Sequence, residues 1–277
     1  MAFDLANLIS CLALRPAEGG RLEGENLALD YRRVFGGQLL AQTIQALRAH
    51  AGDKSLKSLV QYFPREGDVS MPITYAVDER HVGRTFATMG VELTQAGKLI
   101  SAAAASLHLP EAGLENPPTP PSTGSPEDAV PVVIDMIPWE IRVVGGVDLN
   151  DGAVTGPPAF QFWMRVPAEA ITDDSTWTHQ ALLAHSTDLT VIGTALLPIA
   201  GLSQADTGRA FHSAVTTHSL WFHQPFRLTD WVLVDQVAPV LSGGRVFGRG
   251  DVWTADGRLV ASFAQESMVR LLEQPAT

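Results

Sequence analysis

The chain of 277 residues has little cysteine, few basic residues and no long apolar run. Its single cysteine, Cys11, excludes an internal disulfide and a cysteine-rich metal site. No apolar run approaches the roughly 20 residues that a membrane helix needs, and the first residues, MAFDLANLISCLALRPAEGG, lack the basic start and small-residue cleavage site of a signal peptide. The sequence therefore predicts a cytoplasmic protein without membrane attachment.

Acidic residues outnumber basic ones by 30 to 19, and the formal net charge is −11. This balance argues against general binding to nucleic acid or to anionic lipid. An anionic ligand would need local basic residues, such as Arg32, Arg33 and Arg84. A hydrophobic content of 45% with 18% charged residues indicates a globular protein rather than a disordered one.

The segment from Leu109 to Pro131, LPEAGLENPPTPPSTGSPEDAVP, is too rich in proline to continue a helix or a strand. It predicts an interdomain linker that is semi-extended where the prolines cluster. The chain is accordingly divided into an N-terminal unit (1–108), a linker (109–131) and a C-terminal unit (132–277).

The two units resemble each other in sequence. SLVQYFPR at Ser58 matches SLWFHQPFR at Ser219, and GRTF at Gly83 matches GRVF at Gly244 with the same offset. When the alignment of the two units is shifted by one residue, TQAGKLI at Thr94 matches TADGRLV at Thr254. Three matches in one order at nearly one spacing indicate an internal duplication.

Each repeat begins with a helix rich in small residues, FGGQLLAQTIQALRAH from Phe35 and TWTHQALLAHSTDLTVIGTAL from Thr176. Four strand candidates follow each helix, and QAGK and ADGR are tight hairpin turns between the last two. The pattern predicts an α+β fold in which a long helix packs on an antiparallel sheet, twice. The predicted strands are Ser58 to Phe63, Ile73 to Asp78, Thr85 to Thr94, Leu99 to Leu107, Ala214 to Phe222, Trp231 to Val237, Arg245 to Thr254 and Leu259 to Val269.

Asp188 is a lone carboxylate in the apolar run AHSTDLTVIGTAL. If the second helix is continuous, Asp188 falls on one narrow stripe with Trp177, Ala184 and Ile192, which faces the sheet. A buried carboxylate costs several kcal/mol unless it is paired, hydrogen-bonded or open to water. Asp188 is therefore either a structural residue that caps a helix break or a catalytic base.

Gln265 lies in the strand LVASFAQESMV, where alternation places it on one face with Phe263 and Ser267. The matched stretch of the first repeat has Ala105 in its place. Because only one repeat carries this amide, only one of the two equivalent sites is expected to be equipped for chemistry. The alternative is a structural amide that forms hydrogen bonds with polar groups at the edge of the sheet.

Gly36 and Gly37 open the first helix, where paired glycines permit close backbone approach and expose N–H groups to an anion or a polarised carbonyl. The sequence contains no dinucleotide-binding fingerprint, P-loop, nucleophile elbow or metal-binding histidine pair. His185 precedes Asp188 by one helical turn and is placed to contact it. His218 and His223 lie in an aromatic strand, where packing is the expected role.

Together these segments resemble the acyl-CoA thioesterase II family, the double-hotdog thioesterases. The matching segments, in the family's order, are RVFGGQLLAQ, LLAHSTDLTVIGTAL, HSLWFHQPFR and GRLVASFAQESMVR. The resemblance implies two fused hotdog folds and hydrolysis of acyl-CoA to fatty acid and CoA, without metal or redox cofactor. It also implies that Asp188 and Gln265 position the attacking water, and a homo-oligomer is expected by the same resemblance.

The family's third site residue, a threonine or serine, is expected three positions before the histidine of HSLWFH. Here that position is Val215, which preserves the shape of threonine but cannot form a hydrogen bond. Thr216 is adjacent but points to the opposite face unless a bulge intervenes, and Thr217 shares the face of Val215 at about 6.6 Å along the strand.

The leading hypothesis is hydrolysis of small-molecule acyl-CoA, with Asp188 as base, Gln265 fixing the water, and Gly36, Gly37 and Val215 at the substrate. The second is an acyl-CoA-binding double-hotdog protein with little or no turnover, which Val215 favours. A third is an acyl-thioester dehydratase or hydratase, for which only the pair of His185 and Asp188 provides a hint.

Overall fold

The computed structural model describes residues 4–29, 32–134 and 136–272. In this part of the chain, four α-helices and one large β-sheet are joined by loops and short 3-10 turns. The helices are α1 (Leu5–Cys11), α2 (Gly36–Arg48), α3 (Thr176–Thr187) and α4 (Val191–Leu196). The strands are β1 (Arg15–Pro16), β2 (Leu22–Gly24), β3 (Ser55–Tyr62), β4 (Ile73–Val82), β5 (Phe86–Gln95), β6 (Lys98–His108), β7 (Val130–Ile134), β8 (Ile137–Val143), β9 (Ala159–Arg165), β10 (Phe211–Phe222), β11 (Val232–Ser242), β12 (Arg245–Thr254) and β13 (Leu259–Leu271).

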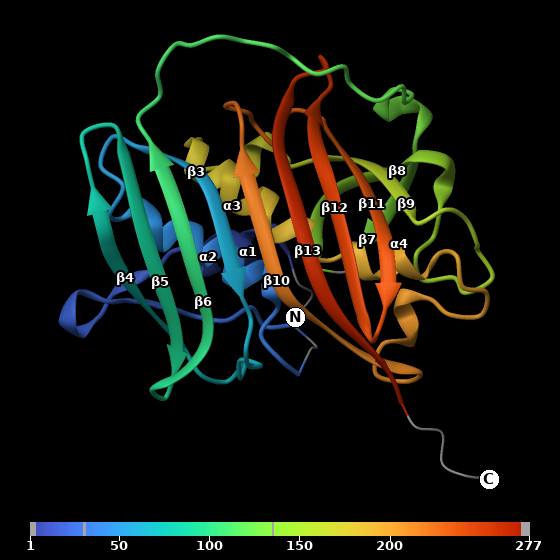
Figure 1. The fold of residues 1–277 in the computed structure, drawn as a ribbon, viewed down its shortest axis with the longest axis horizontal. Helices are drawn as coiled ribbons and strands as arrows, with labels where there is room; N and C mark the ends of the chain where they lie inside the picture. The colour runs from blue at the N-terminus through green and yellow to red at the C-terminus, as the bar shows by residue number, and fades with distance from the viewer. Residues whose placement is uncertain (1–3, 30–31, 135, 273–277) are drawn as a thin grey trace.

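All strands belong to one 13-stranded sheet in the order β1-β2-β4-β5-β6-β3-β10-β13-β12-β11-β9-β8-β7. The N-terminal half forms one side of the sheet and the C-terminal half the other, and both halves place their helices on the same face (Figure 1). The predicted α+β fold of two tandem helix-on-sheet units is confirmed.

The two halves meet where β3 pairs with β10, and Leu59 lies directly opposite Leu220. These two leucines are equivalent residues in the sequence repeat, because Ser58 matches Ser219. A residue that pairs with its own repeat equivalent marks a local two-fold axis. The fold therefore places this axis between two fully buried leucines at the centre of the sheet.

The eight predicted strands correspond to β3–β6 and β10–β13, and β12 has the predicted bounds. The prediction lacks β7, β8 and β9, which extend the C-terminal side. Pro131 in β7 and Pro138 in β8 interrupt the strand pattern, and a proline is tolerated in β7 because that strand forms the sheet edge. Residues 109–125 contain no helix or strand, and β7 begins at Val130, just before the predicted end of the linker.

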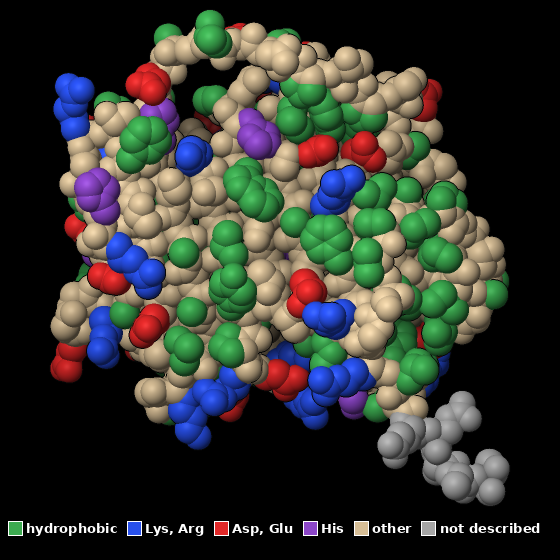
Figure 2. Space-filling view, in the orientation of Figure 1, with side chains coloured by type: hydrophobic (Ala, Val, Ile, Leu, Met, Phe, Trp, Pro, Cys, Tyr) green, Lys and Arg blue, Asp and Glu red, His purple; other side chains and the backbone are tan. Residues whose placement is uncertain are grey.

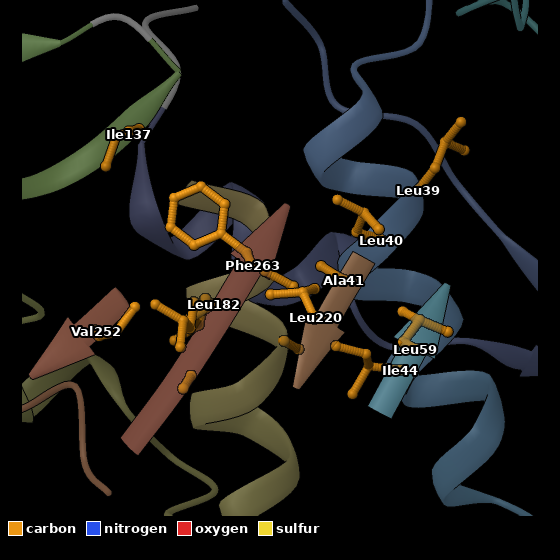
Figure 3. Packing of buried hydrophobic residues seen from close by; sticks show 14 of the residues in the cluster. Leu39, Leu40, Ala41, Ile44, Leu59, Ile137, Leu182, Leu220, Val252 and Phe263 are labelled. Atoms are coloured by element: carbon orange, nitrogen blue, oxygen red, sulfur yellow. The ribbon is translucent and has the colours of Figure 1, made fainter. Parts of the chain in front are cut away.

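The helices pack side by side on the sheet, and their apolar side chains interdigitate with those of the central strands. Leu40 and Ile44 of α2 face Leu59 and Leu220, while Leu182 of α3 lies near β13 (Figure 3). The long linker arches over one end of the sheet (Figure 1). Among the described residues, no helix is long and apolar enough to cross a membrane.

The outer face of the sheet, opposite the helices, carries charged, histidine and hydrophobic side chains (Figure 2). Tyr62, Phe86, Trp221 and Phe247 are exposed on outward positions of the strands. The buried core, and the site described next, lie on the helix side.

Candidate active site

Asp188 occupies the break between α3 and α4, as the C-cap of α3. The prediction of one continuous helix from Thr176 to Leu196 is therefore wrong. Ser186 and Thr187 donate side-chain hydrogen bonds to the carbonyls of Leu183 and Ala184, and hydroxyl groups that bond the preceding turn weaken helix continuation. Asp188 is nevertheless buried, as the stripe predicts, with 4% of its surface exposed.

The glycine pair at the start of α2 lets this helix approach Asp188 closely. The Gly37 N–H donates a hydrogen bond to the Asp188 carboxylate. A Cβ atom at position 36 would lie 2.7 Å from Asp188 Oδ2, and one at position 37 would lie 2.4 Å from the backbone oxygen of His185. Both distances are too short for any side chain, so the approach requires glycine at both positions.

The Asp188 carboxyl group is poised between its two protonation states at neutral pH. Burial raises its pKa to about 7, while the Gly37 N–H and the positive charge of Arg33 act in the opposite direction. Within the described part of the chain, Asp188 Oδ1 accepts no hydrogen bond. One oxygen of this carboxyl group is thus held by a backbone N–H, and the other is buried with an unused capacity to accept a hydrogen bond.

A β-bulge in β10 brings His218 to the inner face of the sheet. The pairing of β10 with β13 shifts register between Val215 and Thr217, so Val215 lies opposite Ser267 and His218 opposite Gln265. Because the bulge adds one residue, alternation reverses beyond it. Val215 and His218 thus share the inner face, and Thr217 does not.

His218 joins Gln265 to the region of Asp188. Its Nδ1 lies 3.0 Å from Gln265 Oε1 and 3.8 Å from Asp188 Oδ1, and its Nε2 lies 3.1 Å from Thr187 Oγ1. Burial lowers the pKa of His218 to about 4, so the imidazole is neutral near pH 7. With Nδ1 protonated, the ring donates to Gln265 Oε1, and Nε2 is left as an acceptor beside the Thr187 hydroxyl.

Gln265 is buried on the predicted face of β13, and both polar atoms of its amide have a hydrogen-bond partner. Its Nε2 donates to Ser267 Oγ at 2.9 Å, and its Oε1 accepts from His218. Sequence reasoning assigned no catalytic role to His218 or Ser267. Alternation already places Ser267 beside Gln265, whereas only the bulge brings His218 to this face.

A cavity of about 340 Å³ opens beside Asp188, between α2, α4 and the start of β10. Asp188, Gly36 and Val215 line it, whereas Gln265 and Ser267 lie behind its wall. Apolar side chains make up much of the lining, which also contains two arginines and Glu66, and Glu66 forms an ion pair with Arg33. The apolar residues include Phe35, Leu39, Phe63, Val133, Ile134, Met136, Leu189 and Ile192, and the arginines are Arg33 and Arg65.

Comparison with known proteins identifies the family to which this chain belongs. The family model of the acyl-CoA thioesterase C-terminal domain matches residues 110–269, and that of the N-terminal domain matches residues 28–108. The chain belongs to the acyl-CoA thioesterase II family. Its double-hotdog architecture agrees with this assignment.

Individual members of the acyl-CoA thioesterase II family match nearly the whole chain. It is 32% identical over 293 residues to acyl-CoA thioesterase 2 of Haemophilus influenzae, covering 99% of this chain and 100% of the relative. It is 29% identical over 300 residues to acyl-coenzyme A thioesterase 8 of Mus musculus, covering 98% and 92%. The crystal structure of the acyl-CoA thioesterase II TesB2 from Mycobacterium marinum superposes with a TM-score of 0.79 at 27% identity, covering 97% of this chain and 99% of that one.

Neither threonine beside Val215 supplies the hydroxyl that the family resemblance implies at that position. The Thr216 hydroxyl donates to the backbone oxygen of Glu266 at 3.0 Å, and Thr217 lies on the outer face because of the bulge. The expectation that Thr217 shares the face of Val215 is wrong. The hydroxyl opposite Val215 on the inner face belongs to Ser267.

His185 Nε2 lies 2.7 Å from the backbone oxygen of Met136, and burial lowers the pKa of its imidazole to about 4. The Nε2 atom of His185 is therefore engaged by the Met136 carbonyl. Within the described residues, no group of three or more His, Cys, Asp or Glu side chains is arranged to hold a metal ion.

Proposed function

We propose that this protein hydrolyses acyl-CoA thioesters to a carboxylic acid and free CoA, with Asp188 as general base. The observation that carries the proposal is the buried Asp188 carboxyl, whose pKa is raised to about 7 and whose Oδ1 accepts no hydrogen bond from the described residues, in the wall of a cavity. Family membership supplies the class of substrate.

In the proposed reaction, ionised Asp188 takes a proton from a water molecule held in the cavity at its carboxylate. The resulting hydroxide attacks the thioester carbonyl and forms a C–O bond, and the carbonyl oxygen becomes negatively charged. When this tetrahedral intermediate collapses, the C–S bond breaks and the CoA sulfur leaves. The protonated Asp188 returns its proton to that sulfur, so the base is regenerated.

The start of α2 is placed to stabilise the negative oxygen. The first N–H groups of a helix have no acceptor within the helix, and they carry the positive end of its dipole. The Gly37 N–H holds Asp188, while Gly36 lines the cavity and can present its N–H to the carbonyl oxygen. The glycine pair would thus orient the base and the substrate together.

Gln265 would act through His218 rather than by direct contact with the water. Its amide lies behind the cavity wall and holds the imidazole, whose Nδ1 donates to Gln265 Oε1 and lies 3.8 Å from Asp188 Oδ1. The apolar lining of the cavity suits an acyl chain. Arg65 would provide positive charge for the phosphates of CoA in a chain that is otherwise acidic, whereas Arg33 forms an ion pair with Glu66 of the same lining.

The decisive experiment measures thiol release from acyl-CoAs of several chain lengths by the parent protein and by Asp188→Asn. The parent should turn over, and the variant should lose about 100-fold or more in kcat, as expected for removal of a general base. Asp53→Asn, an exposed acid in a turn, is the matched control and should behave as the parent. If Asp188→Asn hydrolyses as fast as the parent, the assignment of the base is wrong.

The second candidate function is acyl-CoA binding without rapid turnover, which Val215 favours because this side chain lines the cavity without a hydroxyl. In that case, acyl-CoA would bind with no thiol release, and Val215→Thr would gain hydrolysis. Measurable turnover by the unmodified protein excludes this candidate. The cytoplasmic location, the domain bounds and the homo-oligomer stay predictions from the sequence.

A further inference from the structure

Ser267 is the hydroxyl residue that contacts Gln265 on the inner face of the sheet. It lies two residues beyond Gln265 on β13, is completely buried, and sits directly opposite Val215 of β10. Its Oγ accepts a hydrogen bond from Gln265 Nε2 at 2.9 Å. No other described group accepts from this Nε2, so the amide depends on Ser267 for its orientation.

The orientation of the amide decides which hydrogen His218 presents. A neutral imidazole carries one N–H, and the hydrogen bond made by one ring nitrogen selects the tautomer. With Nε2 of Gln265 on Ser267, Oε1 faces His218 Nδ1 and requires the proton there. The same Nδ1 is the polar ring atom directed toward Asp188 Oδ1.

We propose that Ser267 is a positioning residue for thioester hydrolysis, acting through Gln265 and His218 to keep the imidazole proton on Nδ1, the ring nitrogen that lies 3.8 Å from Asp188 Oδ1. This inference rests on the proposed function. It assigns the reaction a residue that touches neither substrate nor water, because Ser267 lies behind the cavity wall.

The position opposite Ser267 provides a way to test the role of the hydroxyl. Directly opposed side chains on one face of an antiparallel pair have Cβ atoms about 4.5–5.5 Å apart, so a hydroxyl at position 215 can reach the same amide. Val215 and Ser267 form such a pair. A hydroxyl on β10 should therefore replace one on β13.

The experiment compares hydrolysis of one acyl-CoA by the parent, Ser267→Ala, Val215→Thr and the double variant. Loss of one buried hydrogen bond should lower kcat of Ser267→Ala about tenfold, with KM within about twofold of the parent. Because Val215 lines the cavity, Val215→Thr alone is the reference for the added hydroxyl, and the double variant should have a kcat within about threefold of Val215→Thr. Because the new hydroxyl could also restore stability, kcat is expressed per folded molecule, and a loss that came only from weaker folding would then disappear.

Ser219→Ala is the matched control, because Ser219 lies on the outer face of β10 and should leave kcat unchanged. Should Ser267→Ala fail to fold, Ser267→Cys gives the same comparison, since a thiol keeps the size but accepts hydrogen bonds weakly. Unchanged kcat in the Ser267 variant, or a loss that Val215→Thr does not restore, overturns the inference while the proposed function stands. A parent protein that releases no thiol overturns the proposed function, and the inference falls with it.

Discussion

Asp188 Oδ1 lies 3.8 Å from His218 Nδ1, and both side chains are buried. At this distance the two groups influence each other but do not form a direct hydrogen bond. The pKa of Asp188 is raised to about 7 and that of His218 is lowered to about 4, in both cases chiefly because burial disfavours the charged form. The pair is therefore neutral, or carries one negative charge on Asp188, at the pH values where the protein would work.

The pH dependence of hydrolysis should report Asp188. Because a general base works only when ionised, kcat/KM should rise with pH and reach half its plateau near 7, the pKa of Asp188. His218 titrates at about 4 and should not shape the profile near neutrality. Steady-state kinetics across pH 5 to 9 would test this, since a profile that is already flat from pH 5 upward would point to an unperturbed carboxylate or to His218.

Asp188 should reduce stability at high pH. Its folded pKa of about 7 lies above the ordinary 3.8, so folding favours the protonated form, and this contribution is present below pH 3.8 and lost as pH rises through 7. Asp188→Asn cannot ionise and should be more stable than the parent at pH 8 by about 1–3 kcal/mol, with a smaller difference at pH 5. Urea unfolding at both pH values measures this, and Asp53→Asn should show no such gain.

Gly36→Ala should impair activity more than folding. Its new Cβ would meet Asp188 Oδ2 at 2.7 Å, and the carboxylate would have to move away from the cavity. Gly37→Ala would instead press on the backbone oxygen of His185 at 2.4 Å, and overpacking of this kind costs about 1–3 kcal/mol. Thermal unfolding together with kcat/KM separates the two effects. Gly156→Ala is the control, since its Cβ would meet nothing within 4 Å, and equal losses at positions 36 and 37 would contradict the expectation.

Replacement of Leu220 should destabilise the whole protein, because it packs against Leu59 at the junction of the halves. Leu220→Ala should cost about 2–5 kcal/mol, the usual range for a buried leucine. Trp221→Ala removes a larger but exposed side chain from the same strand and should cost much less. Calorimetry should show one shifted transition for Leu220→Ala, and two separate transitions would indicate that the halves unfold independently.

Much of the fold follows from local pattern. Apolar alternation predicts β3–β6 and β10–β13, and the repeat predicts that the halves are equivalent, which the pairing of Leu59 with Leu220 confirms. The strands β7–β9 escape prediction because prolines interrupt two of them. The break after Thr187 escapes it because the helical period continues through Asp188, while the end of α3 depends on hydroxyl contacts with the preceding turn.

The sequence by itself determined that a carboxylate at 188 and an amide at 265 would be buried on the inner side of a duplicated helix-on-sheet fold. Periodicity is sufficient for this, because burial of one face is a property of each element alone. Only the tertiary structure decided what surrounds them: the bulge that turns His218 inward, the hydroxyl of Ser267 opposite Val215, and the burial that raises the pKa of Asp188. These depend on the register between strands and on the exclusion of water, which arise only when distant segments pack together.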